Sequence, residues 1–480
     1  MGKLWDFERY ADFPAMIADT GVTLSYGELA RLSAALGAGI ESVSDWGAEK
    51  CPLTMLVCRN SLGALSGYAA LMNGGYPMLP VSAELSAPAR RELMKRYRPG
   101  LLLLPGELRG EYASLREVAE IRDYVLLKTN YMEPYPVHPA LGLLITTSGS
   151  TGSAKFVRQS WENLRRNAEA LAEILQITSS DKTITALPLQ YTYGLSVLHA
   201  NLLRGAALVV TESSVMDAEF WDLFEAEAVT SVHGVPNTYD MLRRIELFED
   251  DFPSLRTMSQ AGGRLSPELQ DYYARYAAEN GKRFVIMYGQ SEATAAISWL
   301  PPEDALRKPG SVGRIVPQGK AWLIDGNGMP LEGFGARGEL VYQGPNVAMG
   351  YAQSGKDLCR EDEWHGVLRT GDLAVFDEDG YLSVTGRLKR FIKLSGHRTS
   401  LDEVDTLLMD ELNILSASVG TDDHLCVFVT SEADRARVRD YLNKNLSAAR
   451  AGLRVLTIPA FPKNEGGKIL YGELQKIAEQ

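Results

Sequence analysis

The chain has 480 residues, of which 45% are hydrophobic and 23% charged. This balance is typical of a soluble globular protein, and the length predicts at least two domains. The net charge of −12 argues against nucleic acid as a partner, because nucleic acid requires a basic face, and it also disfavours an anionic membrane surface.

The sequence carries no sign of export. No apolar run is long enough to span a bilayer, and the first residues lack the uninterrupted apolar region of a signal peptide. The four cysteines show neither Cys-x-x-Cys nor zinc spacing, and we expect buried thiols in a reducing compartment: Cys51, Cys58, Cys359 and Cys426. We therefore predict a cytoplasmic protein without a membrane partner.

The first elements in chain order alternate between helix and strand. Residues 24–43 carry apolar positions at helical spacing, residues 55–58 are typical of a strand, and residues 62–72 of a small-residue helix. An apolar run at 141–145 indicates a buried strand. This alternation predicts a parallel α/β sheet.

The alternation continues and then changes. Helices are expected at 161–175 and 267–280, and strands at 207–210, 230–235 and 284–287. From Lys308 onward, turn signals at 325–328 and 377–380 separate short β-rich runs. We expect hairpins there, in a β-rich subdomain spanning about 308–389.

The loop after the strand at 141–145 is the most informative motif. Residues 147–155 read TSGSTGSAK. Glycines let backbone N–H groups crowd around an anion, the hydroxyls add donors, and Lys155 adds a positive charge, so the loop suits a polyphosphate. It is not a Walker A loop, because Lys155 is followed by Phe156 instead of Ser or Thr. The alternative is a flexible, solvated Ser/Gly loop.

Four further motifs follow in order. They read YGQSEAT at 288–294, RTGDL at 369–373, GRLKRFIK at 386–393 and PKNEGGK at 462–468. Together with the loop at 147–155, this series resembles the core motifs of the adenylate-forming superfamily, which includes acyl- and aryl-CoA synthetases, adenylation domains of nonribosomal peptide synthetases, and luciferase. The resemblance runs from about residue 24 to the C-terminus and is nearest to the stand-alone acyl and aryl acid ligases.

The resemblance implies a fold of two parts. A large N-terminal adenylation core of parallel α/β sheets with the β-rich subdomain would occupy residues 1–389. A small, mobile α+β lid domain would occupy 391–480, with the hinge at Arg390. The lid would rotate between an adenylating pose and a thioester-forming pose.

The resemblance also implies the ATP site. The β- and γ-phosphates would be held by Thr147, Ser148, Gly149, Ser150, Thr151 and Lys155. The adenosine and α-phosphate would be held by Gly262, Gly263, Tyr288, Gly289, Ser291, Asp372 and Arg387. Among these, Tyr288 would face the adenine, Ser291 an α-phosphate oxygen, Asp372 the ribose hydroxyls, and Arg387 the ribose or a phosphate.

Two more residues would take part in the chemistry. Glu292 would hold Mg²⁺, a hard cation that prefers carboxylate and phosphate oxygens. Lys468 would bridge the acyl carboxylate and the α-phosphate as charge develops. Each role has a simpler alternative. Glu292 could be a solvated carboxylate, Lys468 a solvated loop lysine, and Asp372 a turn or cap residue.

The acid pocket is predicted from residues 187–195, LPLQYTYGL, which resemble the string P-L-F-H-x-Y-G-L of acyl- and aryl-CoA synthetases. Thr192 falls where an aspartate binds the α-ammonium in amino-acid-activating relatives, and a buried ammonium without a carboxylate costs several kcal/mol. We therefore expect an acid without a free α-amino group and with an apolar or aromatic body. The candidate wall, with ordinary core packing as the alternative, is Tyr191, Thr192, Tyr193, His233 and Ala293.

The expected function is that of an ATP-dependent carboxylic acid ligase using ATP and Mg²⁺. It would form an acyl- or aryl-adenylate, release pyrophosphate and pass the acyl group to a thiol. The thiol could belong to CoA or to a phosphopantetheinylated carrier protein, and the short C-terminal domain slightly favours the carrier. The alternatives are an amino-acid-activating adenylation enzyme, a catalytically weak nucleotide-binding regulator, and an oxygenase of the luciferase kind.

Overall fold

The structure is a computed structural model. It describes residues 3–44, 46, 51–131, 133–146, 155–249, 252–388, 390–394, 397–445, 452–463 and 467–479. The predicted phosphate loop, with Thr147, Ser148, Gly149, Ser150 and Thr151, lies outside the described residues.

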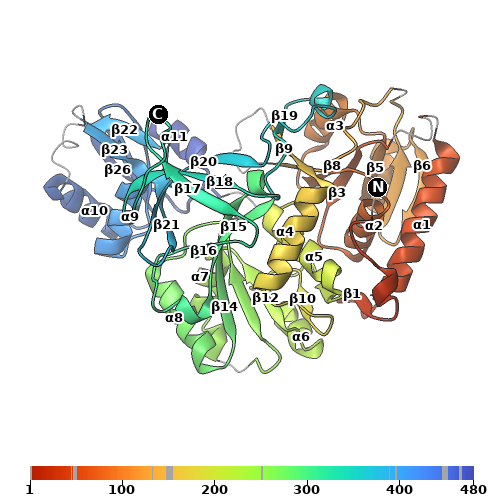
Figure 1. Ribbon diagram of the computed structural model, residues 1–480, viewed down its shortest axis with the longest axis horizontal. Helices are drawn as coiled ribbons and strands as arrows, with labels where there is room; N and C mark the ends of the chain where they lie inside the picture. The colour runs from red at the N-terminus through yellow and green to blue at the C-terminus, as the bar shows by residue number, and fades with distance from the viewer. Residues whose placement is uncertain are drawn as a thin grey trace.

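The N-terminal part is built on an eight-stranded mixed sheet, at the right of Figure 1. Its strands, in spatial order, are β19 (Tyr351–Ala352), β9 (Phe156–Ser160), β8 (Leu141–Thr146), β4 (Met78–Ser82), β3 (Thr54–Cys58), β5 (Leu101–Pro105), β7 (Tyr124–Lys128) and β6 (Arg116–Ile121). Its helices are α1 (Tyr26–Val43), α2 (Leu62–Asn73) and α3 (Ala87–Tyr97).

Helix α1 begins two residues later than predicted because Ser25 caps it. The Ser25 hydroxyl accepts from the Glu28 backbone N–H at 3.2 Å, and the Glu28 carboxylate accepts from the Ser25 N–H at 2.7 Å. This reciprocal pair satisfies two backbone donors at the helix start and fixes where the chain leaves the preceding strand β2 (Thr23–Ser25).

A nine-stranded sheet lies at the lower centre of Figure 1. Its strands, in spatial order, are β16 (Arg314–Ile315), β15 (Ala295–Leu300), β14 (Arg283–Gln290), β13 (Thr257–Gln260), β12 (Ser231–Gly234), β10 (Lys182–Ile184), β11 (Ala207–Val210), β1 (Pro14–Ala18) and β2 (Thr23–Ser25). From β14 to β1 every pairing is parallel. In such a sheet ligands bind beyond the carboxyl ends of the strands.

Helices α4 (Trp161–Ile174) and α5 (Thr192–Arg204) lie between the two large sheets (Figure 1). Helix α4 contacts β8 and β9 of one sheet and β15 of the other. The remaining helices of this part are α6 (Ala218–Ala226), α7 (Pro236–Arg244) and α8 (Pro267–Glu279), with short 3-10 helices η1 (Glu8–Tyr10), η2 (Gly106–Tyr112), η3 (Leu247–Glu249), η4 (Ser291–Ala293), η5 (Pro302–Asp304) and η6 (Gly355–Asp357).

The expected β-rich region is an antiparallel four-stranded sheet of β17 (Lys320–Ile324), β18 (Arg337–Gln343), β20 (Val367–Phe376) and β21 (Leu382–Arg387). Its first strand starts at Lys320, later than the expected 308, because β16 pairs with β15 in the nine-stranded sheet. The predicted turn at 377–380 joins β20 to β21, and the Asp377 carboxylate accepts from the backbone N–H groups of Asp379 and Tyr381.

The C-terminal part is smaller and has its own core. It contains β22 (Phe391–Leu394), β23 (His397–Ser400), α9 (Leu401–Leu412), β24 (Ala417–Thr421), β25 (His424–Val429), α10 (Glu432–Asn445), β26 (Leu453–Thr457) and α11 (Tyr471–Ala478). Two hydrophobic clusters, around Val427 and around Phe428, consist of residues from this part. The predicted fold class, large α/β sheets followed by a small α+β domain, is confirmed.

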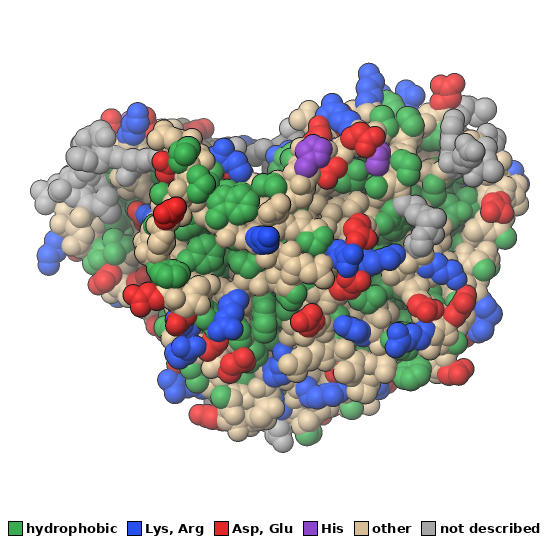
Figure 2. All heavy atoms as spheres, viewed as in Figure 1, with side chains coloured by type: hydrophobic (Ala, Val, Ile, Leu, Met, Phe, Trp, Pro, Cys, Tyr) green, Lys and Arg blue, Asp and Glu red, His purple; other side chains and the backbone are tan. Residues whose placement is uncertain are grey.

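The prediction of four buried cysteines is half wrong. Cys58 on β3 and Cys426 on β25 are buried, whereas Cys51 and Cys359 are exposed because they lie in connections outside the sheets. Within the described ranges, no helix has both the length and the apolar character needed to cross a membrane. On the face seen in Figure 2, acidic and basic side chains are interspersed without a broad patch of one sign.

Candidate active site

A cleft of about 1710 Å³ lies where the nine-stranded sheet, the four-stranded sheet and the C-terminal domain meet. It opens beyond the carboxyl ends of β13 and β14. The residues predicted from sequence that line it are Gly262, Gly263, Tyr288, Gly289, Asp372, Arg387, Arg390 and Lys468. Residues up to about 200 positions apart in the chain are therefore brought to one site.

Asp372 is the buried acceptor of this cleft, 6% exposed. Strand pairing sets Asp372 opposite Arg387, whose Nε lies 3.3 Å from Oδ1. The Tyr288 hydroxyl donates to Oδ2 at 2.5 Å. Burial raises the pKa of Asp372, and the charge of Arg387 and the bond from Tyr288 oppose this rise. A carboxylate has about four lone-pair sites, so Asp372 can accept additional hydroxyl groups.

Lys468 reaches the cleft from the loop before α11. Lys463, in the same loop, donates from Nζ to Oδ1 of Asn237 at 2.5 Å, and so fastens the loop to the start of α7. Burial lowers the pKa of Lys468, and Arg387 lowers it further, whereas the charges of Asp372 and Glu292 oppose the change. The ammonium group of Lys468 therefore lies within electrostatic range of both predicted carboxylates.

Other contacts hold the C-terminal domain against the core. Arg264 Nη1 donates to the Thr406 hydroxyl at 2.7 Å, and the Arg387 N–H donates to Asp402 Oδ2 at 2.8 Å. Arg337 forms an ion pair with Glu403. These contacts join the first turns of α9 to the core.

Arg390, the predicted hinge, has a side chain anchored in the C-terminal domain. Its guanidinium pairs with Asp402 and lies 3.3 Å from Asp405 Oδ2, donates to the Ser418 carbonyl at 2.6 Å, and lies 3.6 Å from the centre of the Tyr471 ring. Burial raises the pKa of Asp405 to about 6, although Arg390 opposes the rise. The side chain at the boundary therefore moves with the C-terminal domain in any rotation.

The 3-10 helix η4 presents Ser291 and Glu292. The Ser291 hydroxyl lies 2.7 Å from the hydroxyl of Thr192, at the start of α5. The half-buried Glu292 accepts at Oε1 from the Tyr351 hydroxyl at 2.8 Å. The exposed Lys155 places Nζ 3.6 Å from the centre of the same Tyr351 ring. Four predicted site residues thus form two contacts: Ser291 bonds to Thr192, and Glu292 and Lys155 both contact Tyr351.

The donor set fits magnesium held partly by a nucleotide. Throughout the described ranges, no group of three or more His, Cys, Asp or Glu could hold a metal ion. Glu292 is a single carboxylate oriented by a hydroxyl donor, and Mg²⁺ is commonly held by one or two carboxylates together with substrate phosphates. Glu292 is therefore suited to share the ion with ATP.

The predicted acid pocket is a packed group of side chains. The ring of Tyr193 lies edge-on to the rings of Tyr191 and His233, with centroids 6.5 and 6.4 Å away. A Cβ added at Gly262 would overlap the Tyr191 hydroxyl, so glycine is required there for close packing. Ala293 is fully buried in the hydrophobic cluster that also contains Tyr193.

A buried hydrogen-bonded series underlies this pocket. The Ser259 hydroxyl lies 2.6 Å from the Tyr193 hydroxyl and 2.5 Å from His233 Nδ1. Burial lowers the pKa of His233 to about 3, so the imidazole is neutral. His233 also lines a small cavity of about 30 Å³, and its Nε2 has no hydrogen-bond partner among the residues that the structure describes.

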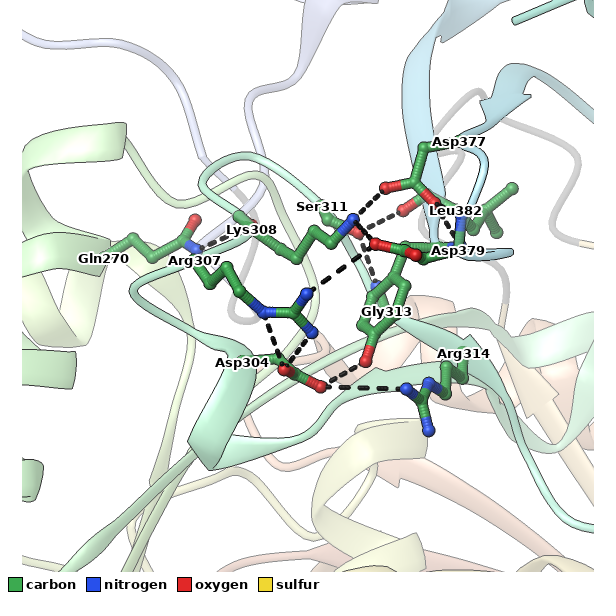
Figure 3. Close-up of polar contacts among 11 residues, drawn as sticks. Gln270, Asp304, Arg307, Lys308, Ser311, Gly313, Arg314, Asp377, Asp379 and Leu382 are labelled. Carbon is green, nitrogen blue, oxygen red and sulfur yellow. Dashed lines mark hydrogen bonds and ion pairs between the residues drawn. The ribbon is translucent and has the colours of Figure 1, made fainter. Parts of the chain in front are cut away.

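One wall of the cleft is fixed by the polar cluster shown in Figure 3. Lys308 Nζ lies 2.6 Å from Asp377 Oδ2, and the Ser311 hydroxyl donates to the Leu382 carbonyl at 2.7 Å. Gln270 of α8 accepts from the Gly310 N–H at 3.0 Å. These bonds tie the segment before β16 to the β20–β21 hairpin, so that Gly310 and Ser311 hold their places in the cleft lining.

Sequence reasoning missed Tyr351, Ser259 and Asp402. Tyr351 and Ser259 contact predicted site residues from strands remote in sequence, and only the strand register brings them near. The Asp402 carboxylate joins two parts of one predicted motif by accepting from the Arg387 N–H and pairing with Arg390. Its position at the first turn of α9 is a signal that could have indicated a charge partner.

Comparison with known proteins agrees with this geometry. The family model described as AMP-binding enzyme matches residues 5–352. A probable CoA ligase of Humulus lupulus is 30% identical over 68% of this chain, and the match spans 64% of that relative. The indoleacetate–CoA ligase of Aromatoleum aromaticum is 26% identical over 95% of this chain and 93% of its own length.

Solved structures share the fold. The o-succinylbenzoate CoA synthetase of Bacillus subtilis, solved with its acyl-adenylate intermediate, superposes with a TM-score of 0.79 at 22% identity, covering 99% of this chain and 98% of that one. Another structure of that synthetase contains ATP and a magnesium ion. The chain belongs to the AMP-binding enzyme family, and the predicted superfamily is confirmed.

Proposed function

We propose that the protein activates a small carboxylic acid with ATP, releases pyrophosphate, and transfers the acyl group from the adenylate to a thiol. The observation that carries the proposal is the position of Lys468. It enters from the C-terminal domain the cleft lined by Tyr288 and Asp372, and its pKa responds to the charges of Asp372 and Glu292. A cation at this point can act on an α-phosphate held nearby.

Each residue of the cleft has a separate role in the proposed adenylation. Asp372 accepts from the ribose hydroxyls, Tyr288 orients that carboxylate, and Gly262 and Gly263 allow the adenine to approach the backbone. Lys468 neutralises negative charge as the acid attacks the α-phosphate. When bound at Glu292, Mg²⁺ would neutralise charge on the leaving phosphates.

The acid is selected between α5 and the ends of β12 and β13. Thr192 donates or accepts a hydrogen bond with Ser291 and carries no charge, so an α-ammonium group would enter without a carboxylate partner at this position. We propose that an acid lacking this group is preferred by about 10²-fold over its α-amino counterpart. The comparison of kcat/KM for such a pair measures the preference, and a faster amino acid would contradict it.

The thiol acceptor is proposed to be CoA, with a carrier-protein phosphopantetheine as the second candidate. Several of the named relatives are CoA ligases, which supports CoA. Both acceptors share the same thiol chemistry, so they are separated by offering each in turn.

The test is a panel of carboxylic acids in which pyrophosphate release and hydroxamate trapping are measured together. Pyrophosphate release that depends on the acid, followed by thioester formation with CoA or holo-carrier protein, supports the proposal. Phosphate release without acid would identify an ATPase instead. Nucleotide binding with no turnover across the panel would identify a regulatory protein.

A further inference from the structure

We infer that Tyr351 is a positioning residue that joins the magnesium carboxylate Glu292 to the phosphate-loop lysine Lys155. The inference rests on the proposed function and adds a residue to its ATP site. Tyr351 makes one contact through its hydroxyl and another through its ring, and the hydroxyl contact can be removed while the ring is kept.

The strand register explains why Tyr351 lies there. Strand β19 pairs antiparallel with β9, and Tyr351 is opposite Val157, two residues after Lys155. The ring is wedged edge-on against Trp364, with centroids 4.9 Å apart and planes at 88°. A half-buried aromatic ring fixed on two sides presents its hydroxyl in a defined direction.

The hydroxyl of Tyr351 orients Glu292. It donates to Oε1 at 2.8 Å, while the Glu292 carbonyl accepts from the Ala348 N–H at 2.9 Å. Both the backbone and the carboxylate of Glu292 are thus held by the segment that leads into β19. An ionised carboxylate can only accept hydrogen bonds, so the Tyr351 hydroxyl is the donor in this contact.

The ring of Tyr351 positions Lys155. The ammonium nitrogen lies 3.6 Å from the ring centre, well inside the range of about 6 Å for attraction between a cation and an aromatic face. A tyrosine ring can thus hold the lysine beside the metal carboxylate without neutralising it. The ammonium group then remains available to the phosphates of the nucleotide.

Two substitutions separate the contacts. Tyr351→Phe removes the hydroxyl and keeps the ring, so the affinity for Mg²⁺ should fall by about 10-fold, as is usual when a hydrogen-bond partner of a metal ligand is lost. Tyr351→Leu removes both contacts, and should weaken nucleotide binding by about a further 2- to 5-fold. If Tyr351 served folding alone, both substitutions would lower the melting temperature, and they would not differ in their effects on Mg²⁺ and nucleotide affinity.

The matched control is Tyr97→Phe. The Tyr97 hydroxyl donates to the carbonyl of Ala352, the residue after Tyr351 on the same strand, at 3.1 Å. Removing it deletes a tyrosine hydroxyl bound to β19 without touching Glu292. Metal and nucleotide affinity should remain within about twofold of the unsubstituted protein.

The measurement is binding of Mn²⁺, as a spectroscopic substitute for Mg²⁺, in the presence of an ATP analogue that cannot be cleaved. Weaker Mn²⁺ binding in Tyr351→Phe, with Tyr97→Phe unchanged, supports the inference. Unchanged binding in Tyr351→Phe, or an equal loss in Tyr97→Phe, overturns it. Because no acid is turned over, the outcome does not depend on whether the acid panel reveals ligase activity.

Discussion

Substitution of Lys468 by alanine should cripple adenylate formation while leaving ATP binding nearly intact. The side chain comes from the C-terminal domain, and the groups that act on its pKa are Arg387, Asp372 and Glu292. The last two are residues expected at the ribose and at the metal. Lys468 therefore acts at the junction of these groups, where the acid must meet the α-phosphate.

The size of the effect follows from the kind of contact that is lost. One positioned charge acting on the transition state contributes about 10²–10³ in rate. A secondary effect is expected because Lys468 lowers the pKa of Asp372, so its removal raises that pKa further. ATP affinity should change by only about threefold, because Lys468 acts mainly in the transition state.

The assay is acid-dependent pyrophosphate release, with ATP binding measured by calorimetry on the same sample. The matched control is Lys463→Ala. Lys463 lies in the same loop as Lys468, but its side chain binds Asn237, which has no proposed role in the chemistry. It should reduce the rate by less than about tenfold, because only loop attachment is weakened. If Lys468→Ala releases pyrophosphate at the unsubstituted rate, Lys468 has no part in the chemistry.

Two further predictions concern buried groups. Arg390→Ala should destabilise the C-terminal domain at pH 8 by about 3–5 kcal/mol in urea unfolding, because it leaves Asp405 without its cation. In the folded protein the pKa of Asp405 is about 6, above the unfolded value of about 3.9. The contribution of Asp405 to the free energy of unfolding is therefore present at low pH and is lost as pH rises through about 6. The loss of unfolding free energy caused by Arg390→Ala should therefore be smaller below pH 6 than at pH 8. Adding Asp405→Asn to this variant should restore stability at pH 8. A loss that does not depend on pH would contradict this account. His233 should carry its proton on Nε2 and remain neutral from pH 5 to 8, because burial lowers its pKa to about 3. The measurement is nitrogen-15 NMR of the imidazole ring, and a ring that titrates over that pH range would contradict the prediction.

The tautomer of His233 follows from counting donors. If the Tyr193 hydroxyl donates to Ser259, then Ser259 donates to His233 Nδ1, and within the described part of the chain only the Nε2 proton of this series lacks a partner. In the reverse direction both the Tyr193 proton and the Nε2 lone pair lack partners. Since each buried unsatisfied group costs about 1–3 kcal/mol, the first arrangement is favoured.

Much of the fold could be predicted because the elements have strong local signals. The strand at 207–210 was predicted to the residue, and the helix at 62–72 was short by one residue. The strand at 284–287 was predicted too short, since β14 runs over Arg283–Gln290. Its last residues, Tyr288 to Gln290, are site residues whose polar character hides the strand pattern and whose extended form depends on pairing with β15.

The site was predicted as a set of residues, but its connections were not. Motif order identified Asp372 and Glu292, whereas the hydroxyl donors of Tyr288 and Tyr351 depend on contacts across sheets. The half-buried position of Asp405 beside Arg390 is similarly a product of tertiary packing. The order of motifs along the chain cannot show which side chain will orient another.

The contacts of Arg390 change how its role as a hinge should be tested. The hinge remains a prediction, and a proline at this position would both restrict φ and delete a guanidinium that binds Asp402, Asp405 and the Ser418 carbonyl. Loss of thioester formation in Arg390→Pro could then follow from a destabilised domain alone. A comparison of Arg390→Pro with Arg390→Ala separates the two effects, because both variants lose the guanidinium and only the first restricts the backbone. If Arg390→Pro loses thioester formation and keeps adenylation while Arg390→Ala retains both, rotation about residue 390 is supported. If both variants retain thioester formation, the hinge lies elsewhere, and if both lose it, the loss comes from the missing guanidinium and not from a restricted backbone.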